Sequence, residues 1–307
     1  MSEIQRWEVK EPWMNIHCSL GEGPYLEPAT NTLRFVDIIE KRLHTVGVAE
    51  GLRSLRTLQF DQPVGVTADI EGVDPSKRIL VGGKTGIFIL ERETGKLTPL
   101  TRFYDTEDEE RDDRMRSNDG AVDPQGRFWV ATMNDFHVDP MEDEGILYRF
   151  NSDVSRHALY HNLKIPNSIG WSRDQKTMYL THSTARQILA FDYAPESGSL
   201  SNERVFWSYS GSGEPDGFKL DVEGNLWSAI YGDAKVVKIS PEGKTIGEVS
   251  YPTNCITCPV FVGTELWVTT AKDGDEKEAA NGKLGGAIYK IDVGVGGARE
   301  TKFKLDE

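Results

Sequence analysis

Three short polar side chains recur along the chain at intervals of one repeat and carry groups that bind hard cations. Asn118, Asn167 and Asp216 each stand just before a strand-like run, and 49 residues separate each from the next. Glu22 has the matching place nearer the N-terminus, in SLGEGPYLEP. Two carboxylates and two amide oxygens suit Ca²⁺, Mg²⁺ or Mn²⁺, with water completing the shell. No histidine or cysteine stands at the equivalent position of another repeat, which disfavours a dedicated zinc site.

Each of these residues alone has a simpler explanation. Asn and Asp before a strand commonly satisfy backbone groups in turns, and residues 118–120, Asn-Asp-Gly, have the composition of a tight turn. Four residues at equivalent positions of a repeat are harder to explain this way, because two acids crowded together need a compensating cation. We therefore expect Glu22, Asn118, Asn167 and Asp216 to converge.

An internal repeat supplies the elements that would position these side chains. A turn followed by a strand with a large apolar anchor is clearest in residues 123–133, 221–231 and 262–271. The anchors of all six copies, spaced by 40 to 50 residues, are Phe35, Leu80, Trp129, Tyr179, Trp227 and Trp267. Period-2 apolar runs between Gly, Asp and Pro turns indicate antiparallel sheet, and no long amphipathic helix accompanies them.

Six such repeats predict an all-β fold, a six-bladed β-propeller that residues 1–307 form as a single domain. A pair of β-sandwiches is the alternative, but it does not predict six evenly spaced anchors. The inner strand of each blade lines the central channel, so the four polar residues should lie at one mouth of it and form a metal site there. Residues 7–15 are expected to supply the outer strand of the last blade and close the ring.

Other residues are expected near the same mouth. Residues 134–145 and 272–286 are long insertions after second strands, and they are either lids or solvated acidic loops. Arg116 either binds a substrate anion or carbonyl, or forms a surface ion pair with the acidic residues 107–113. His182 follows the second strand of blade four and is a candidate for assisting catalysis.

Composition limits the partners and the compartment. A net charge of −14 opposes binding to nucleic acid or anionic membranes. No apolar run approaches membrane-spanning length and no signal-peptide core is present, so a cytoplasmic monomer or dimer is expected. Cys18, Cys255 and Cys258 do not suggest a disulfide framework, and CITC (255–258) has a strand-like rather than a helical context, which disfavours a redox or zinc role.

Five motifs resemble the senescence-marker-protein/gluconolactonase/luciferin-regenerating family, and they extend in order from about residue 15 to residue 293. They are LGEGPYLEP…LRFVDI, RSNDGAVDPQGRFWVATM, IPNSIGWS, EPDGFKLDVEGNLWSAIY and GGAIYKI. The resemblance implies one divalent metal, Ca²⁺ foremost with Mg²⁺, Mn²⁺ or Zn²⁺ as alternatives, held by Glu22, Asn167 and Asp216. It also implies that Asn118 lies near metal and substrate and that Arg116 contacts the substrate.

One stretch departs from the family pattern. Regucalcin-like members have a substrate-contacting Glu after the TM of blade three, whereas this chain reads ATMNDFHV, with Phe136 at that place and Asp135 beside it. An aromatic side chain there favours a less polar substrate than a polyhydroxylated sugar lactone.

These patterns lead to the hypothesis of a divalent-metal-dependent lactonase. The metal would polarise the lactone carbonyl, Asp216 would act as ligand and general base, and Asn118 and Arg116 would orient the ring oxygens. Two alternatives stay open: a non-catalytic, calcium-binding regulatory propeller, and an esterase or phosphotriesterase that uses the same site.

Overall fold

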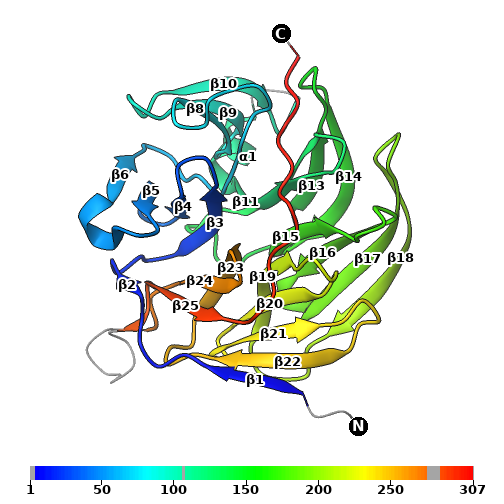
Figure 1. Cartoon of the computed structure of the whole chain (residues 1–307). Coiled ribbons are helices and arrows are strands. Elements are labelled where there is room, and N and C mark those ends of the chain that lie inside the picture. Colours follow the sequence, from blue (N-terminus) through cyan, green and yellow to red (C-terminus); the bar gives the residue numbers. More distant parts are fainter. Residues whose placement is uncertain (1–3, 106–107, 275–283, 307) are drawn as a thin grey trace.

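The computed structural model describes residues 4–105, 108–274 and 284–306. Six sheets of four or five strands surround a central channel (Figure 1). In four of them the strands follow chain order from the channel outward, and in the other two an N-terminal strand is outermost. The prediction of an all-β, six-bladed propeller is confirmed. Among the described residues, no helix is long and apolar enough to cross a membrane.

Each blade is a meander of short antiparallel strands. Blade one contains β3 (Gly21–Glu27), β4 (Thr32–Asp37), β5 (Arg42–Gly47) and β6 (Arg56–Gln59), and blade two contains β7 (Val66–Ala68), β8 (Arg78–Gly82), β9 (Gly86–Glu91) and β10 (Leu97–Arg102). Blade three contains β11 (Met115–Val122), β12 (Phe128–Asn134), β13 (Gly145–Phe150) and β14 (Arg156–Leu163), and blade four contains β15 (Pro166–Trp171), β16 (Thr177–His182), β17 (Gln187–Ala194) and β18 (Ser199–Ser208). Blade five contains β19 (Glu214–Leu220), β20 (Leu226–Tyr231), β21 (Lys235–Ile239) and β22 (Thr245–Ser250), and blade six contains β23 (Ile256–Val262), β24 (Glu265–Thr270), β25 (Ala287–Asp292) and β2 (Met14–Asn15). The short helices are η1 (Gly51–Ser54), α1 (Glu109–Arg114) and η2 (Ser183–Ala185).

The repeated hairpin has a local physical cause. In blade five the buried Asp221 accepts hydrogen bonds from two backbone amides of its own turn and, at 2.9 Å, from the indole Nε1 of Trp227. Gly224 closes this turn at a φ of +91°, which favours glycine. Asp123 makes the same bond to Trp129 in blade three, at 3.0 Å. One carboxylate therefore shapes the turn and fixes the buried anchor of the following strand.

The N-terminal segment closes the ring and also covers the neighbouring blade. Residues 14 and 15 form β2, which pairs with β25 as the outer strand of blade six. The preceding strand β1 (Gln5–Glu8) instead pairs in parallel with β22 of blade five. Trp7 packs there against Trp227, with ring centroids 5.3 Å apart. The prediction that residues 7–15 supply the outer strand of blade six is therefore confirmed for residues 14 and 15, whereas residues 7 and 8 belong to β1 on the neighbouring blade.

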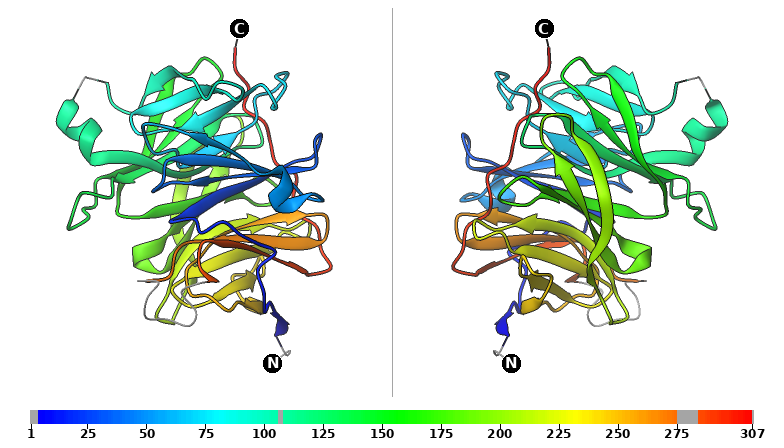
Figure 2. Two further views of the ribbon diagram at one scale, coloured as in Figure 1. Left: turned by 90° about the vertical axis from the view of Figure 1, so that its left-hand side faces the viewer. Right: turned by 90° about the vertical axis from the view of Figure 1, so that its right-hand side faces the viewer.

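The C-terminal segment covers the end of the channel opposite the predicted site. It forms bridges from Gly297 to Asp221 and from Phe303 to Ile70, both beyond the far ends of inner strands. Phe303 is fully buried. Figure 2 shows α1 projecting from one face of the propeller and the C-terminal segment passing over the other. The two faces therefore differ: one is strapped by the chain terminus, and the other carries the inner-strand residues singled out above.

Candidate functional site

A β-bulge interrupts each inner strand that carries a predicted site residue. The register shifts enclose residues 118–119 in β11, 167–168 in β15 and 216–217 in β19, and a fourth at residues 23–24 follows Glu22 in β3. A bulge bends the strand and redirects its side chains. The site residues therefore lie within the inner strands, and the prediction that they precede the strands, with residues 118–120 as a tight turn, is wrong.

The two asparagines contact each other across neighbouring blades. The side-chain amide of Asn118 donates to the carbonyl oxygen of Pro166 at 2.8 Å and to Oδ1 of Asn167 at 3.3 Å. Asn167 donates in turn to Oγ of Ser183 at 3.0 Å. These bonds fix the amide planes, and each amide oxygen keeps a second lone pair for another partner.

The carboxylates of the mouth are buried together. The residues Glu22 and Asp216 are 6% and 8% exposed. Burial, and after it the negative charge of Asp119, raises the pKa of Glu22 to about 8. Burial, followed by the charges of Glu22 and Asp119, raises the pKa of Asp216 well above its usual range. A divalent cation is the group that would relieve this repulsion, so the donor set fits a hard metal ion.

Asp119 belongs to this cluster, and sequence reasoning missed it. It is 7% exposed, accepts from Oγ of Ser168 at 2.7 Å, and its pKa is raised by burial. Because of the bulge, consecutive residues of β11 both reach the next blade: Asn118 contacts Asn167 and Asp119 contacts Ser168. The available signal was the repeat itself, since Ser168 stands 49 residues after Asp119.

Arg116 is buried beside the cluster and forms no ion pair with residues 108–113, the described part of the acidic segment. Its guanidinium donates to the carbonyl oxygen of Ser117 at 2.9 Å and to Oδ1 of Asn118 at 2.8 Å. Its Nε is buried without a hydrogen bond from any described residue. Burial lowers the pKa of Arg116 to about 10, against the raising effect of Asp135 and Glu22, so the group stays charged at neutral pH. A fixed cation with a free donor can bind an oxygen of a ligand.

The insertion at residues 134–145 places two predicted substrate contacts beside this guanidinium. The ring of Phe136 lies 4.3 Å from Cζ of Arg116, and the residue is 39% exposed. Asp135 is ion-paired with Lys84 and lies 3.9 Å from Nε of Arg116. Oδ1 of Asp135, the oxygen nearest Arg116, also accepts from the amide of Phe136 at 2.8 Å, whereas Oδ2 contacts Lys84. The aromatic ring thus forms part of the rim, while Asp135 is mainly engaged within the protein.

His182 lies at the same end of blade four, paired in register with Pro166 next to Asn167. Burial lowers the pKa of His182, and its Nε2 has no hydrogen-bond partner among the described residues.

Hydrogen bonds connect the two ends of the insertion at residues 134–145, because Glu144 accepts from Asn134 at 2.6 Å and from Arg114 at 2.7 Å. The second insertion, 272–286, lies largely outside the described residues, and a lid role for either stays a prediction.

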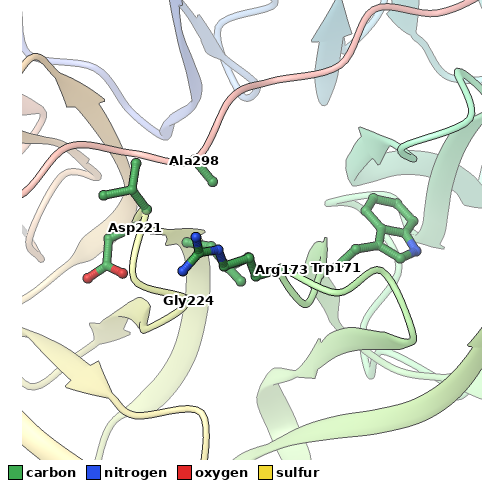
Figure 3. A pocket seen from close by; sticks show the side chains of 7 residues that line it. Trp171, Arg173, Asp221, Gly224 and Ala298 are labelled. Atoms are coloured by element: carbon green, nitrogen blue, oxygen red, sulfur yellow. The ribbon is translucent and has the colours of Figure 1, made fainter.

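Cavities lie at both ends of the inner strands. A narrow one inside the channel is lined by Asp119, Ser168, Lys219 and Cys258 among others, next to the carboxylate cluster. A pocket of about 210 Å³ opens at the opposite end, between Trp171, Arg173, Asp221 and Ala298 (Figure 3). No predicted site residue lines that pocket, and its carboxylate is the one that shapes the turn of blade five. The candidate site is therefore the mouth that contains the carboxylates.

The chain is similar to known proteins over most of its length. A family model described as the SMP-30/Gluconolactonase/LRE-like region matches residues 20–272. Regucalcin of Xenopus laevis is 33% identical over 294 residues, which cover 92% of this chain and 94% of that protein. Pentonolactonase XacC of Haloferax volcanii is 32% identical over 295 residues, covering 93% and 94%. A solved structure described as a calcium-binding protein, regucalcin, from Agrobacterium tumefaciens superimposes with a TM-score of 0.85 at 25% identity, covering 97% and 99%.

This chain belongs to the SMP-30/gluconolactonase/LRE-like family. The matched segment begins just before Glu22 and includes Asn118, Asn167 and Asp216, so the family region contains the whole candidate site.

Proposed function

We propose that the protein is a divalent-metal-dependent lactonase, a carboxylic ester hydrolase that opens a sugar lactone or a related lactone at the channel mouth. The observation behind this proposal is the buried cluster of Glu22, Asp119 and Asp216 beside the bonded asparagines. A relative named pentonolactonase that is similar over nearly the whole chain supports the reaction class.

Glu22, Asn167 and Asp216 would hold the metal, with Asn118 beside it. Ca²⁺ is the first candidate, because the donors are all oxygens, and Mg²⁺, Mn²⁺ and Zn²⁺ are the alternatives. When bound, the ion would supply Lewis-acid polarisation of the lactone carbonyl.

The chain's own residues would move the protons and orient the ring. Asp216 would accept a proton from the attacking water, because one oxygen of its carboxylate can hold the metal while the other meets the water. The water oxygen forms the new bond to the carbonyl carbon, the ring C–O bond breaks, and the proton passes to the leaving alkoxide oxygen. The products are a carboxylic acid and a hydroxyl on one molecule. Arg116, fixed by Ser117 and Asn118, donates to a substrate oxygen.

The rim favours a substrate with an apolar portion. Phe136 is exposed over Arg116, and Asp135 is engaged by Lys84. A hydroxyl-rich ring would find an aromatic face here rather than a free carboxylate. We therefore expect alkyl- or aryl-substituted lactones to be turned over faster than gluconolactone.

A lactone panel with metal depletion tests the proposal. The wild-type protein is treated with EDTA and assayed before and after addition of Ca²⁺, Mg²⁺, Mn²⁺ or Zn²⁺, together with Asp216→Asn and, as a matched control, the exposed Glu203→Gln. We expect turnover that requires metal, is lost in Asp216→Asn and is unchanged in Glu203→Gln. Full turnover without metal, or in Asp216→Asn, would contradict the mechanism.

A calcium-binding regulatory propeller is the second candidate, because similar proteins are named regucalcin and one solved neighbour is described as calcium-binding. It predicts Ca²⁺ binding that depends on Glu22 and Asp216 but no hydrolysis of any lactone. Aryl esters and a phosphotriester in the same panel would detect the esterase or phosphotriesterase alternative.

A further inference from the structure

We propose that Cys18, Asp37 and His44 form a second metal site, for zinc or a similarly thiophilic divalent ion, separate from the oxygen-lined mouth. One donor atom of each residue lies within 4.8 Å of the donor atoms of the other two. All three residues are buried, at 3%, 1% and 5% exposure. A thiol, a carboxylate and an imidazole together are a zinc-type donor set, unlike the carboxylate and amide oxygens of the mouth.

The three residues meet where the propeller ring closes. Cys18 lies in the connection from β2, the outer strand of blade six, to β3, the inner strand of blade one. It packs in one apolar cluster with Phe35 of blade one and Trp267 of blade six. Asp37 ends β4 and His44 lies in β5. We call these three residues the seam cluster, because they lie where blades six and one meet. An ion held by them would join the N-terminal segment to blade one.

The donor atoms are near enough for a tetrahedral ion. Zinc bonds of about 2.0–2.3 Å place ligand atoms roughly 3.3–3.8 Å apart. Starting from atoms within 4.8 Å of one another, the side chains need to approach by about 1 Å or slightly more, which small rotations of the cysteine and histidine can supply. Three protein ligands leave the fourth position to water.

Neighbouring groups already orient two of the three ligands. Nδ1 of His44 shares a hydrogen bond of 2.9 Å with Oγ1 of Thr57, and the ring stacks on Phe35 at 5.1 Å. A hydrogen bond of this kind on one ring nitrogen commonly directs the other toward a metal. Oδ1 of Asp37 accepts from the amides of Leu20 and Glu40 at 3.0 and 3.2 Å. Oδ2 accepts from the amide of Ser19 at 2.8 Å, which leaves a lone pair of Oδ2 for a cation.

At neutral pH the imidazole of the site is free of a proton charge, whereas the thiol is protonated. Burial, with a smaller effect of Arg42, lowers the pKa of His44 to about 4, so the imidazole is neutral. Burial and then Asp37 raise the pKa of Cys18, so the metal must displace the thiol proton. Arg42 stands opposite Asp37 in the sheet, and Glu40 lies 3.8 Å from its guanidinium and offsets part of its charge.

Occupancy of the seam site would also affect the mouth. Gly21 pairs with Asp37, and a Cβ on Gly21 would lie 3.2 Å from Cβ of Cys18. The next residue in β3 is Glu22. The seam cluster therefore supports the backbone that presents one of the mouth carboxylates.

Cobalt is the most direct probe, because a thiolate bound to Co²⁺ gives a charge-transfer absorption that oxygen ligands do not give. Reduced, full-length protein in excess Ca²⁺, which occupies the mouth, is titrated with Co²⁺. We expect one Co²⁺ per chain and a thiolate band in the wild type, no band in Cys18→Ala, and an unchanged band in Cys258→Ala and Asp216→Asn. Zn²⁺ should displace Co²⁺ and should raise the Tm of the wild type but not of Cys18→Ala.

Cys258 is the informative control, because it is a buried free thiol close enough to Glu22 and Asp216 for their charges to act on it. A band that is lost in Cys258→Ala and kept in Cys18→Ala would assign the cobalt to the mouth and overturn the proposal. Absence of a thiolate band in the folded wild type would also overturn it. His44→Gln keeps the thiol and should weaken Co²⁺ binding about tenfold or more, which provides a test even if Cys18→Ala folds poorly.

Discussion

Neutralising one mouth carboxylate should stabilise the metal-free protein at neutral and alkaline pH. In the fold, burial and Asp119 raise the pKa of Glu22 to about 8 from an ordinary value of 4.5. A change of this size corresponds to about 5 kcal/mol of unfolding free energy. The protonated carboxyl is the form that the fold favours. Its contribution is therefore fully present below pH 4.5, falls as the pH rises, and is lost above about pH 8.

Urea unfolding in EDTA at pH 5 and pH 8.5 measures this effect. We expect the wild type to lose stability between the two conditions, with Glu22 contributing at most about 5 kcal/mol of the loss and the raised pKa of Asp216 adding to it, and Glu22→Gln to lose less. Glu203→Gln, an exposed glutamate on β18, should behave like the wild type. Saturating Ca²⁺ should reverse the order, since a ligand at 1,000 times its Kd adds about 4 kcal/mol to a fold that binds it.

Two results would refute this reasoning. If metal-free wild type has the same unfolding free energy at both pH values, the carboxyl is not destabilised by burial at the mouth. If Glu22→Gln shows the same fall as wild type, the pH dependence arises elsewhere in the chain. Either result would also remove the electrostatic argument for a cation at this position.

Three further predictions concern the turn of blade five and the rim. Asp221→Asn places an amide donor or a weaker acceptor against the turn amides and the indole of Trp227. Urea unfolding should therefore show an unfolding free energy lower by about 2–4 kcal/mol, while the kcat of the folded protein is unchanged. Arg116→Lys keeps the charge but loses the planar guanidinium that contacts Asn118, so steady-state kinetics should show a fall in kcat/KM of about tenfold or more. Unchanged kinetics would exclude a substrate role for Arg116. Phe136→Glu should move the ratio of kcat/KM for gluconolactone over an alkyl lactone upward by about tenfold, and a ratio that stays constant would remove the ring from the account of specificity.

The propeller could be predicted because its repeat is encoded locally. Asp221, Gly224 and Trp227 act within seven consecutive residues, so the same pattern in another blade produces the same hairpin. The even spacing of the anchors then gives the number of blades. The place of β1 is different, because Trp7 packs against Trp227 of blade five and no local pattern specifies that partner.

The residues of the candidate site could be predicted from their equal spacing, but their geometry could not. Asn118, Asn167 and Asp216 could be singled out because they recur at equal intervals, and the structure places them in equivalent bulges. The bulges themselves depend on cross-strand register, which a single sequence does not display. Asp119 was therefore assigned to a turn, and the three residues of the seam cluster, which come from separate elements, share no spacing that would have connected them.

The bulges also explain why buried carboxylates gather at the mouth. In a regular strand, alternate residues face opposite sides, so a channel-lining strand offers one side chain for every two residues. In β11 the bulge brings both Asn118 and Asp119 to the neighbouring blade. This doubles the density of polar groups and adds a third carboxylate to Glu22 and Asp216, which raises the pKa of both. The same backbone irregularity thus concentrates oxygen donors and makes the metal-free state less stable, so metal affinity and folding stability should change together in any variant that alters the bulge.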